Sequence, residues 1–493
     1  MQSVLAIDSG TTGATCLVIA ADGRVLGRGY REITQHYPEP GRVEHDATEI
    51  LERTLAAARD AIAHSKVVPT TIGITNQRET IVLWDRRTSA PLGPAIVWQD
   101  RRTAERCAQL APRAAEIAER TGLLPDPYFS ATKLEWLLAR NEVRLMAEEG
   151  SLAAGTIDSW LIWNLTGGAV HATDPTNASR TMLYDIGAHE WSDDMLALFG
   201  VPRAMLPEVR SSSGDFGVAH GALLGLAHDV PINGVAGDQQ AALFGQGCWI
   251  SGEGKNTYGT GAFLLLNTGA VRGAPGGGLL TTVACDAKGQ PAYAFEGAIF
   301  IAGAAIQWLR DGLGIIAVAS ETEALARGIA SNDGVYFVPA LTGLGAPYWE
   351  PDARGMIVGL TRGTTRAHLA RAALESMAYA TADVLELMQQ RASCSFGRLR
   401  VDGGATGNEW LMQYQADVLG VPVERAGMAE VTALGAAGLA GIAAGVWHDA
   451  HAFVGTRRFD TFTPGRGADA AQWARAGWAR AVRATLAWTR DRA

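Results

Sequence analysis

The sequence predicts an α/β protein made of two related domains, and three observations favour this fold class. Patterns typical of strands and of helices alternate along the chain. A short strand–turn–strand unit occurs twice, near the start of each half. The length of 493 residues exceeds what a single hydrophobic core accommodates. We therefore expect one domain over residues 1–246 and a second over residues 247–493.

The repeated unit is predicted to be a β-hairpin with a turn of Gly and Thr. In the first half it spans residues 4–19, with the turn at residues 8–13 (DSGTTG). In the second half it spans residues 255–266, with the turn at residues 259–261 (GTG). Backbone N–H groups and short hydroxyls in such turns can approach a phosphate closely, because no larger side chain blocks them. Two such turns indicate a nucleotide phosphate held from both sides.

The elements after the first hairpin continue the sheet and then begin a helix. Residues 25–30 are expected to complete a three-stranded meander. Asp46 followed by Glu49 is typical of a capping box. Apolar residues at helical spacing follow, so the sequence predicts a helix that runs through residue 63.

Two further strands are predicted at residues 71–75 and 80–84. Between them lies a polar insert, residues 76–79 (NQRE), where a loop is expected. Residues 111–229 are richer in loops and helices, so we interpret them as an elaboration of the first domain.

The second half is expected to repeat the alternation. Residues 245–251 are the best domain boundary, because the second hairpin starts just beyond them. A long helix is predicted over residues 365–391, followed by a strand at residues 399–402. Two glycines and a helix opened by Asn408 come next. Residues 431–447 are uncharged but short and rich in Ala and Gly, which favours a closely packed helix over a membrane span.

Composition and charge exclude several classes of protein. Hydrophobic content of 47% and charged content of 19% are typical of a folded enzyme. A net charge of −9 without a basic run argues against nonspecific nucleic-acid binding, although an acidic protein can still bind ATP. Five scattered cysteines without a C-x-x-C pair indicate reduced thiols. The first ten residues lack the basic segment of a signal peptide, and we expect a cytoplasmic protein without membrane insertion.

Two carboxylates have positions that favour a role in phosphoryl transfer. Asp238 follows an apolar strand and precedes a helix-like segment, so it is either a general base for an acceptor hydroxyl or the N-cap of that helix. Asp8 ends the first strand, where a carboxylate can hold Mg²⁺ through water or close an Asx-turn.

Ten segments, in the same order along almost the full chain, resemble the FGGY family of carbohydrate kinases, and within it the members that phosphorylate glycerol. The matching segments are residues 37–46 (YPEPGRVEHD), 73–80 (GITNQRET), 95–103 (AIVWQDRRT), 126–130 (DPYFS), 173–183 (TDPTNASRTML), 236–246 (AGDQQAALFGQ), 255–261 (KNTYGTG), 342–349 (TGLGAPYW), 359–363 (GLTRG) and 400–404 (RVDGG).

The resemblance implies a fold of two ribonuclease-H-like domains around a central cleft, as in actin, hexokinase and the heat-shock ATPases. It also implies ATP-dependent phosphorylation of glycerol to sn-glycerol 3-phosphate, with Mg²⁺, in a homo-oligomer (dimer or tetramer). A kinase for another small polyol or ketose and a non-catalytic ATP-driven switch are the alternatives.

The resemblance also implies roles for individual residues. Asp238 would be the catalytic base, and Asp8 and Asp238 would serve the metal. Core packing is the alternative for Trp98 and Phe263, and a turn or packing position is the alternative for Gly303. The implied substrate residues are Arg78, Glu79, Trp98, Tyr128, Asp238, Gln239 and Phe263, and the implied nucleotide residues are Thr11, Thr12, Gly13, Thr260, Gly303, Gln307, Gly404 and Asn408.

The chain departs from the family pattern at several positions. Ser9 and Thr15 replace residues that are usually Gln and often Arg near the phosphates, so some charge stabilisation is expected to be weaker or to come from elsewhere. Residues 218–229 lack the Gly-rich Lys/Arg loop by which some members bind fructose 1,6-bisphosphate. Ala470 stands where some members carry a Glu that joins a zinc site with a regulator protein.

Overall fold

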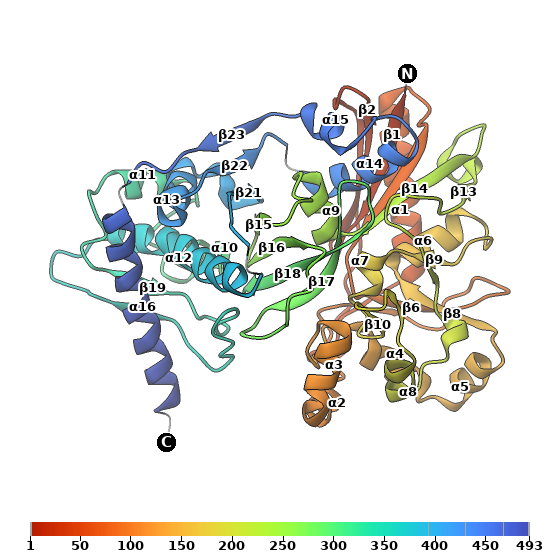
Figure 1. Cartoon of the computed structure of the whole chain (residues 1–493), viewed down its shortest axis with the longest axis horizontal. Helices are drawn as coiled ribbons and strands as arrows, with labels where there is room; N and C mark the ends of the chain where they lie inside the picture. Colours follow the sequence, from red (N-terminus) through yellow and green to blue (C-terminus); the bar gives the residue numbers. More distant parts are fainter. Residues whose placement is uncertain (1, 393, 429, 467, 492–493) are drawn as a thin grey trace.

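The chain folds around two large mixed β-sheets, one for each half of the sequence (Figure 1). Its architecture is described from a computed structural model, which covers residues 2–392, 394–428, 430–466 and 468–491. In Figure 1 the first half forms the right-hand lobe, in red to yellow, and most of the second half forms the left-hand lobe, in green to blue.

The first sheet has six strands and carries the first predicted hairpin. Strands β1, β2 and β3 form an antiparallel meander, whereas β5 and β14 run parallel to β1. The expected meander is therefore confirmed. The order across the sheet is β13 (Val218–Ala219), β14 (Val230–Gly237), β5 (Thr71–Asn76), β1 (Ser3–Ser9), β2 (Gly13–Ala20) and β3 (Val25–Glu32).

The second sheet repeats this topology with seven strands. Strands β15, β16 and β18 are antiparallel neighbours, and β21 and β22 run parallel to β15. Three antiparallel strands followed by two parallel ones therefore occur in both sheets, as expected of two ribonuclease-H-like domains. The order is β17 (Leu280–Cys285), β18 (Pro291–Ile299), β16 (Ala262–Gly269), β15 (Glu253–Tyr258), β21 (Arg398–Asp402), β22 (Val423–Ala426) and β23 (Phe459–Phe462).

Helix α1 (Ala47–Ser65) confirms the predicted helix and extends it by two residues. The Asp46 carboxylate caps it by accepting hydrogen bonds from the N–H groups of Thr48 and Glu49. Only half of the predicted capping box forms, because the Glu49 carboxylate accepts from Thr34 and Arg53 instead. The apolar face of α1 packs on β2 and β3 and closes one side of the first core.

A third, four-stranded sheet and several short helices lie beside the first sheet, and the elaboration expected over residues 111–229 forms only part of this region. The strands are β4 (Glu44–His45), β7 (Ala95–Ile96), β6 (Ile81–Asp85) and β8 (Leu152–Thr156), in that order. A separate apolar cluster holds this region together. Its helices are α2 (Ala104–Gln109), α3 (Ala114–Thr121), α4 (Ser130–Leu138), α5 (Asn141–Glu148), α6 (Ile157–Leu165), α7 (Pro175–Ala178) and α8 (Asp193–Phe199), and its short strands are β9 (Ala172–Thr173), β10 (Tyr184–Asp185), β11 (Glu190–Trp191) and β12 (Glu208–Val209).

The second half adds helices around its sheet, and the predicted long helix is among them. It is α12 (Arg366–Ala392), which packs against α11, α13 and the sheet to form the larger core. The other elements of this half are α10 (Gly303–Gln307), α11 (Glu321–Arg327), α13 (Glu409–Leu419), α14 (Val431–Ala443), α15 (Ala450–Gly455), α16 (Ala468–Arg490), β19 (Tyr336–Val338) and β20 (Met356–Val358), whereas α9 (Asp238–Gly245) ends the first half.

Helix α14 explains the Ala- and Gly-rich segment. It leaves the second lobe and packs on β1, β5, β14 and α9 of the first, as Figure 1 shows. A Cβ atom on Gly435 would overlap the carbonyl of Ala241, and one on Gly73 would overlap the carbonyl of Ala436. Glycine therefore permits the close approach that the sequence predicted. Within the described residues, no helix is long and apolar enough to cross a membrane.

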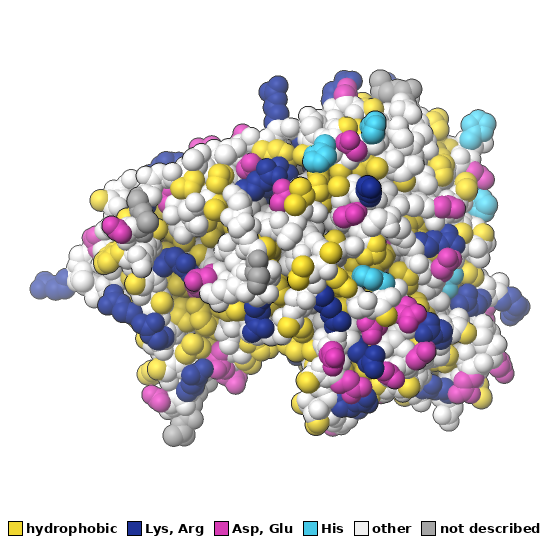
Figure 2. All heavy atoms as spheres, in the orientation of Figure 1, with side chains coloured by type: hydrophobic (Ala, Val, Ile, Leu, Met, Phe, Trp, Pro, Cys, Tyr) yellow, Lys and Arg dark blue, Asp and Glu magenta, His cyan; other side chains and the backbone are white. Residues whose placement is uncertain are grey.

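The surface and the thiols agree with the composition. Figure 2 shows Lys and Arg side chains interspersed with Asp and Glu side chains across the visible face. The five cysteines are free, and four of them are buried. Burial raises the pKa of the Cys107 thiol to about 11, which keeps it protonated.

Candidate active site

The candidate site is built where three neighbouring parallel strands end. Strand β1 ends just after Asp8, and β5 ends at Asn76 and leads into the polar insert. Strand β14 ends at Gly237, and Asp238 follows as the first residue of α9. The carboxyl ends of neighbouring parallel strands lie at one sheet edge, which is where α/β proteins bind ligands. The two predicted carboxylates and the polar loop therefore share this edge.

Asp238 lies beside the arginine of the polar loop. Its Oδ1 is 3.2 Å from Nε of Arg78 and accepts a hydrogen bond from the N–H of Gln239 at 2.7 Å. Its side chain keeps 31% of its surface exposed, so a ligand can reach it. Burial raises the pKa of Asp238, and Arg78 opposes that rise. The N-cap alternative is wrong, because Gly237 occupies the N-cap of α9.

Hydrogen bonds fix the Arg78 guanidinium on two sides. Its Nη1 donates to Glu296 at 2.6 Å and to Gln240 at 3.2 Å. Its Nη2 donates to the other Glu296 oxygen at 3.2 Å and to the Tyr128 hydroxyl at 3.4 Å. The remaining N–H, on Nε, finds no acceptor in hydrogen-bonding geometry among the described residues. This buried N–H is therefore a candidate donor to a ligand that enters beside Asp238.

A second arginine, Arg180, completes a buried ring of alternating charges. Its Nε donates to Glu79 at 2.6 Å and its Nη2 donates to Glu296 at 3.0 Å. Its guanidinium lies 5.5 Å from the ring centre of Tyr128, within cation–π range. Burial would raise the pKa of Glu296, but Arg180 and Arg78 outweigh burial and lower that pKa to about 2. The structure thus brings together four of the predicted substrate residues (Arg78, Glu79, Tyr128 and Asp238) and three residues that were not predicted (Arg180, Gln240 and Glu296).

The predicted aromatic wall contacts the first turn. The indole N–H of Trp98 donates to the hydroxyl of Thr11 at 2.9 Å, and its ring meets Tyr128 edge-on at 5.5 Å. Trp98 and Phe263 are only partly buried, which disfavours core packing for both. Phe263 lies on β16, opposite Thr257 of β15.

The first predicted turn is a tight hairpin loop. The N–H of Gly10 donates to the carbonyl of Gly13 at 3.0 Å, which closes the turn. Thr11 is partly exposed and Thr12 is exposed at its tip. A Cβ atom on Gly13 would clash with Tyr30 and with the carbonyl of Arg31, so only glycine fits there. The turn therefore offers backbone amides and hydroxyls to a ligand.

Asp8 and Asp238 fit a divalent cation. Burial and then the charge of Asp238 raise the pKa of Asp8 to about 7. Two carboxylates that disfavour each other's ionisation gain from a cation between them. No cluster of three or more metal-ligating side chains occurs among the described residues. This arrangement suits Mg²⁺, which keeps several waters and binds substrate phosphates.

The second turn is closed by α10. The N–H of Gly259 donates to the carbonyl of Gly261 at 2.8 Å, and the N–H of Gly303 donates to the carbonyl of Gly259 at 3.0 Å. The N–H groups of Ala302 and Ala304 donate to the carbonyl of Thr260. A Cβ atom on Gly303 would lie 2.6 Å from the Gly259 carbonyl, so packing against the turn accounts for this glycine.

Of the remaining predicted nucleotide residues, Gly404 lies next to this second turn, whereas Gln307 and Asn408 lie at the end of α10 and at the start of α13. Gly404 is exposed and directly follows Gly403, whose Cβ would overlap the backbone of Tyr258 next to the turn. Gln307 is exposed at the end of α10. Asn408 caps α13 through its side-chain oxygen, and its amide donates to Thr322 at 3.3 Å. Asn408 therefore has a structural role whether or not it contacts a nucleotide.

Four site residues escaped prediction from the sequence: Arg180, Gln240, Lys255 and Glu296. Lys255 is fully buried and donates from Nζ to Gln239 and to Thr257. Burial lowers the pKa of Lys255, and the charges of Asp402 and Asp238 oppose that effect. For Glu296 the available signal was a lone charge in the otherwise apolar residues 291–299, whereas Arg180 and Lys255 lie among polar residues and gave no such signal.

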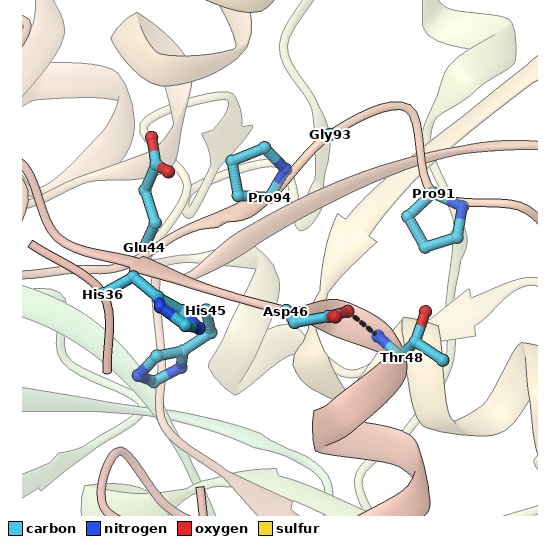
Figure 3. Close-up of a pocket in the computed structure, with 8 residues that line it drawn as sticks. All are labelled: His36, Glu44, His45, Asp46, Thr48, Pro91, Gly93 and Pro94. Atoms are coloured by element: carbon cyan, nitrogen blue, oxygen red, sulfur yellow. Dashed lines mark hydrogen bonds between the residues drawn. The ribbon is translucent and has the colours of Figure 1, made fainter. Parts of the chain in front are cut away.

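Figure 3 shows the residues that line a surface hollow of about 350 Å³. None of the predicted site residues lines it. Its buried wall residue His45 comes within 3.4 Å of the Gln77 side chain, which is next to Arg78. The residues around the hollow are His36, Glu44, His45, Asp46, Thr48, Pro91, Gly93 and Pro94.

Comparison with protein families gives two matches. Residues 3–245 match the N-terminal domain of the FGGY family of carbohydrate kinases. Residues 254–444 match the C-terminal domain of the same family.

Curated relatives match over the whole chain. A protein named glycerol kinase from Dechloromonas aromatica is 52% identical, covering 99% of this chain and 98% of its own. Glycerol kinase 2 from Thermotoga maritima is 51% identical, covering 99% of both chains.

Solved structures have the same fold. Plasmodium falciparum glycerol kinase with ADP is 35% identical, with a TM-score of 0.94 over 99% of this chain and 98% of that one. Gluconate kinase from Lactobacillus acidophilus has a TM-score of 0.88 over 99% of both chains at 20% identity, which is a likeness of fold alone.

Proposed function

The chain belongs to the FGGY family of carbohydrate kinases, and from that premise we propose that it transfers the γ-phosphoryl group of ATP to glycerol. The full-length relatives at about half identity carry the name glycerol kinase. A structural neighbour of that name contains ADP, which supports ATP as the donor. The product is sn-glycerol 3-phosphate.

The observation that carries this proposal is the position of Asp238. It lies 3.2 Å from Arg78, at the sheet edge that also holds Asp8 and the first turn. Phosphoryl transfer needs an acceptor hydroxyl in line with the γ-phosphate and a base that takes its proton. A partly exposed carboxylate beside a guanidinium with one unused N–H meets the second need and can orient a hydroxyl.

In the proposed reaction a glycerol hydroxyl oxygen bonds to the γ-phosphorus, and the bond to the bridging oxygen of ADP breaks. Asp238 takes the hydroxyl proton. Arg78 donates from Nε to the substrate, and Glu79 accepts from another hydroxyl. Trp98, Tyr128 and Phe263 enclose the carbon chain, and Gln239 adds a polar contact beside the base.

The nucleotide is proposed to lie across both turns. Thr11, Thr12, Gly13 and Thr260 would hold its phosphates, and Gly303, Gln307, Gly404 and Asn408 would line the nucleoside. We propose Mg²⁺ as the metal, held by Asp8 and Asp238. When bound, it would compensate the charge of the phosphates.

Further features rest on the resemblance and stay predictions. They are the assignment of glycerol binding to a domain of residues 1–246 and of nucleotide binding to a domain of residues 247–493, the assembly into a homo-oligomer and the cytoplasmic location.

An assay of ADP release tests the proposal and its alternatives. Purified protein is supplied with Mg-ATP and with glycerol, dihydroxyacetone, erythritol or xylulose. We expect ADP release that depends on glycerol and is fastest with it. Fastest turnover with a ketose would favour the related kinases, and turnover independent of any acceptor would favour an ATP-driven switch.

A further inference from the structure

Glu296 lies on β18 of the second sheet, yet both of its charged partners belong to the first half. It forms a side-on pair with Arg78, in which Nη1 faces one carboxylate oxygen at 2.6 Å and Nη2 faces the other at 3.2 Å. Both side chains are 2% exposed. A bidentate pair of this kind fixes the plane of the guanidinium as well as its position.

The hydrogen bonds of Arg78 show what this fixation achieves. A guanidinium has five N–H donors in a rigid fork. Four of them are engaged by Glu296, Gln240 and Tyr128. The fifth, on Nε, faces Asp238 at 3.2 Å without a hydrogen-bonding partner among the described residues. Glu296 therefore holds the fork so that its one free donor faces the reacting group.

Arg180 holds Glu296 in turn. It is fully buried and joins Glu296 at 3.0 Å to Glu79 at 2.6 Å. It also stacks near Phe129, 5.2 Å from the ring centre. Because Glu79 directly follows Arg78, the same ring of charges fixes both adjacent residues of the polar loop.

We propose that Glu296 is a positioning residue, which, held by Arg180, orients Arg78 so that its Nε binds the polyol beside Asp238. This inference deepens the proposed function and rests on it. The inference gives strand β18 of the second half a role in binding the acceptor. The sequence had indicated only first-half residues and Phe263 for that role.

Loss of the Glu296 charge has a defined consequence. Without it, Asp238 is the nearest carboxylate that can still face Arg78, and Nε is already 3.2 Å from it. The guanidinium is then free to turn its terminal nitrogens toward Asp238. That rotation removes the donor for the substrate and engages the base, whereas the two phosphate turns are untouched.

The first test compares Glu296→Gln with the wild type in steady-state assays. We expect kcat/KM for glycerol to fall by about tenfold to a hundredfold, because a buried donor and acceptor are misaligned. The KM for ATP should change by less than about twofold. Equal losses for ATP and for glycerol would instead indicate a folding defect. Glu296→Asp keeps the charge at shorter reach and should recover part of the loss.

A matched control is available in α12. Arg371 and Glu375 form another buried pair, 4% and 2% exposed, with Nε and Oε1 2.8 Å apart. Glu375→Gln removes the same chemical group far along the chain from the polar loop. We expect it to lower the melting temperature as Glu296→Gln does, but to leave kcat/KM for glycerol within about twofold of wild type.

A double-mutant cycle decides whether Glu296 acts through Arg78. In an Arg78→Ala background, Glu296→Gln should cause little further loss in kcat/KM for glycerol, because its partner is gone. Full additivity of the two losses would overturn the proposal. If Glu296→Gln does not fold, Arg180→Lys replaces it in the cycle, and it should likewise lose most of its effect when Arg78 is absent.

The outcomes separate this inference from the proposed function. Failure of the wild type to release ADP with glycerol would refute the function before any variant is compared. Should another polyol be the true acceptor, the same cycle is run with that polyol. An active wild type with unchanged glycerol kinetics in Glu296→Gln, or with equal losses for ATP and glycerol, would refute the positioning role alone.

Discussion

Asp238 has a partly exposed carboxylate with a cation 3.2 Å away, which is the combination that a base for a hydroxyl needs. Asp238→Asn keeps the shape of the side chain but cannot accept the proton. We expect kcat to fall by about 10² to 10⁴. Equilibrium binding of ATP should persist, which calorimetry can measure. A variant that retains a tenth or more of the wild-type kcat would remove Asp238 from this role.

Arg78 is expected to affect one substrate only. Its unpartnered N–H faces Asp238, where the acceptor is proposed to bind, and the phosphate turns lie on other strands. Arg78→Ala leaves buried acceptors unpaired, which costs about 1 to 3 kcal/mol, or roughly tenfold to a hundredfold in kcat/KM for glycerol. The KM for ATP should barely move. Equal losses for both substrates would indicate a defect in folding instead.

The sequence allowed part of the site to be predicted because that part is local. Asp8 lies near the end of β1, and Arg78 and Asp238 lie within two residues after the ends of β5 and β14, so short motifs at one sheet edge reveal them. Glu296 and Arg180 are different. Glu296 and Arg180 reach the site only because segments that are distant in the sequence meet in the fold. A single buried charge does not form a recognisable sequence motif. Only the fold shows which partners such charges find.

At the scale of elements, helix α14 depends on glycine where it crosses α9. A methyl group on Gly435 would overlap the backbone carbonyl of Ala241, and backbone atoms cannot yield as a side-chain end can. We expect Gly435→Ala to destabilise the protein by about 1 to 3 kcal/mol. Thermal unfolding measures the loss. Gly455→Ala at the end of α15, where a Cβ atom meets open space, is the control and should leave the melting temperature nearly unchanged.

Element types were predictable where the local pattern was strong. The hairpins, α1 and α12 follow from apolar periodicity, Gly/Thr turns and capping residues. The position of α14 was not predictable, because an apolar helix can pack on either sheet. Gly435 of α14 fits the backbone of α9, and Gly73 of β5 fits the backbone of α14, and that complementarity exists only in three dimensions.

The chemistry of residues 218–229 predicts that fructose 1,6-bisphosphate does not regulate this protein. It contains no Lys or Arg. The Asp229 carboxylate accepts a hydrogen bond from the N–H of Gly221 at 2.9 Å. This backbone amide is therefore already engaged and does not serve a phosphate group. We expect millimolar fructose 1,6-bisphosphate not to inhibit the enzyme at neutral pH. Saturable, noncompetitive inhibition with free Mg²⁺ held constant would contradict this and would place an effector site elsewhere.

At the scale of the whole molecule, both lobes contribute residues to the proposed site. The first turn lies on the first sheet and the second turn on the second sheet, and Glu296 of β18 holds Arg78 of the first lobe. ATP that contacts both turns would tie the lobes together from one side. Glycerol held by Arg78 would connect the lobes from the opposite side of the site. Both ligands together should therefore favour a closed state.

Small-angle X-ray scattering can measure this closure in solution. We expect the radius of gyration to decrease when glycerol and a nonhydrolysable ATP analogue are both present at saturation, and to decrease less with either ligand alone. Arg78→Ala is the matched control, because it should bind the analogue but not glycerol, and so should show only the response to the nucleotide. A wild-type radius that stays the same with both ligands bound, as verified by calorimetry, would mean that the lobes hold one arrangement and that the site is preformed.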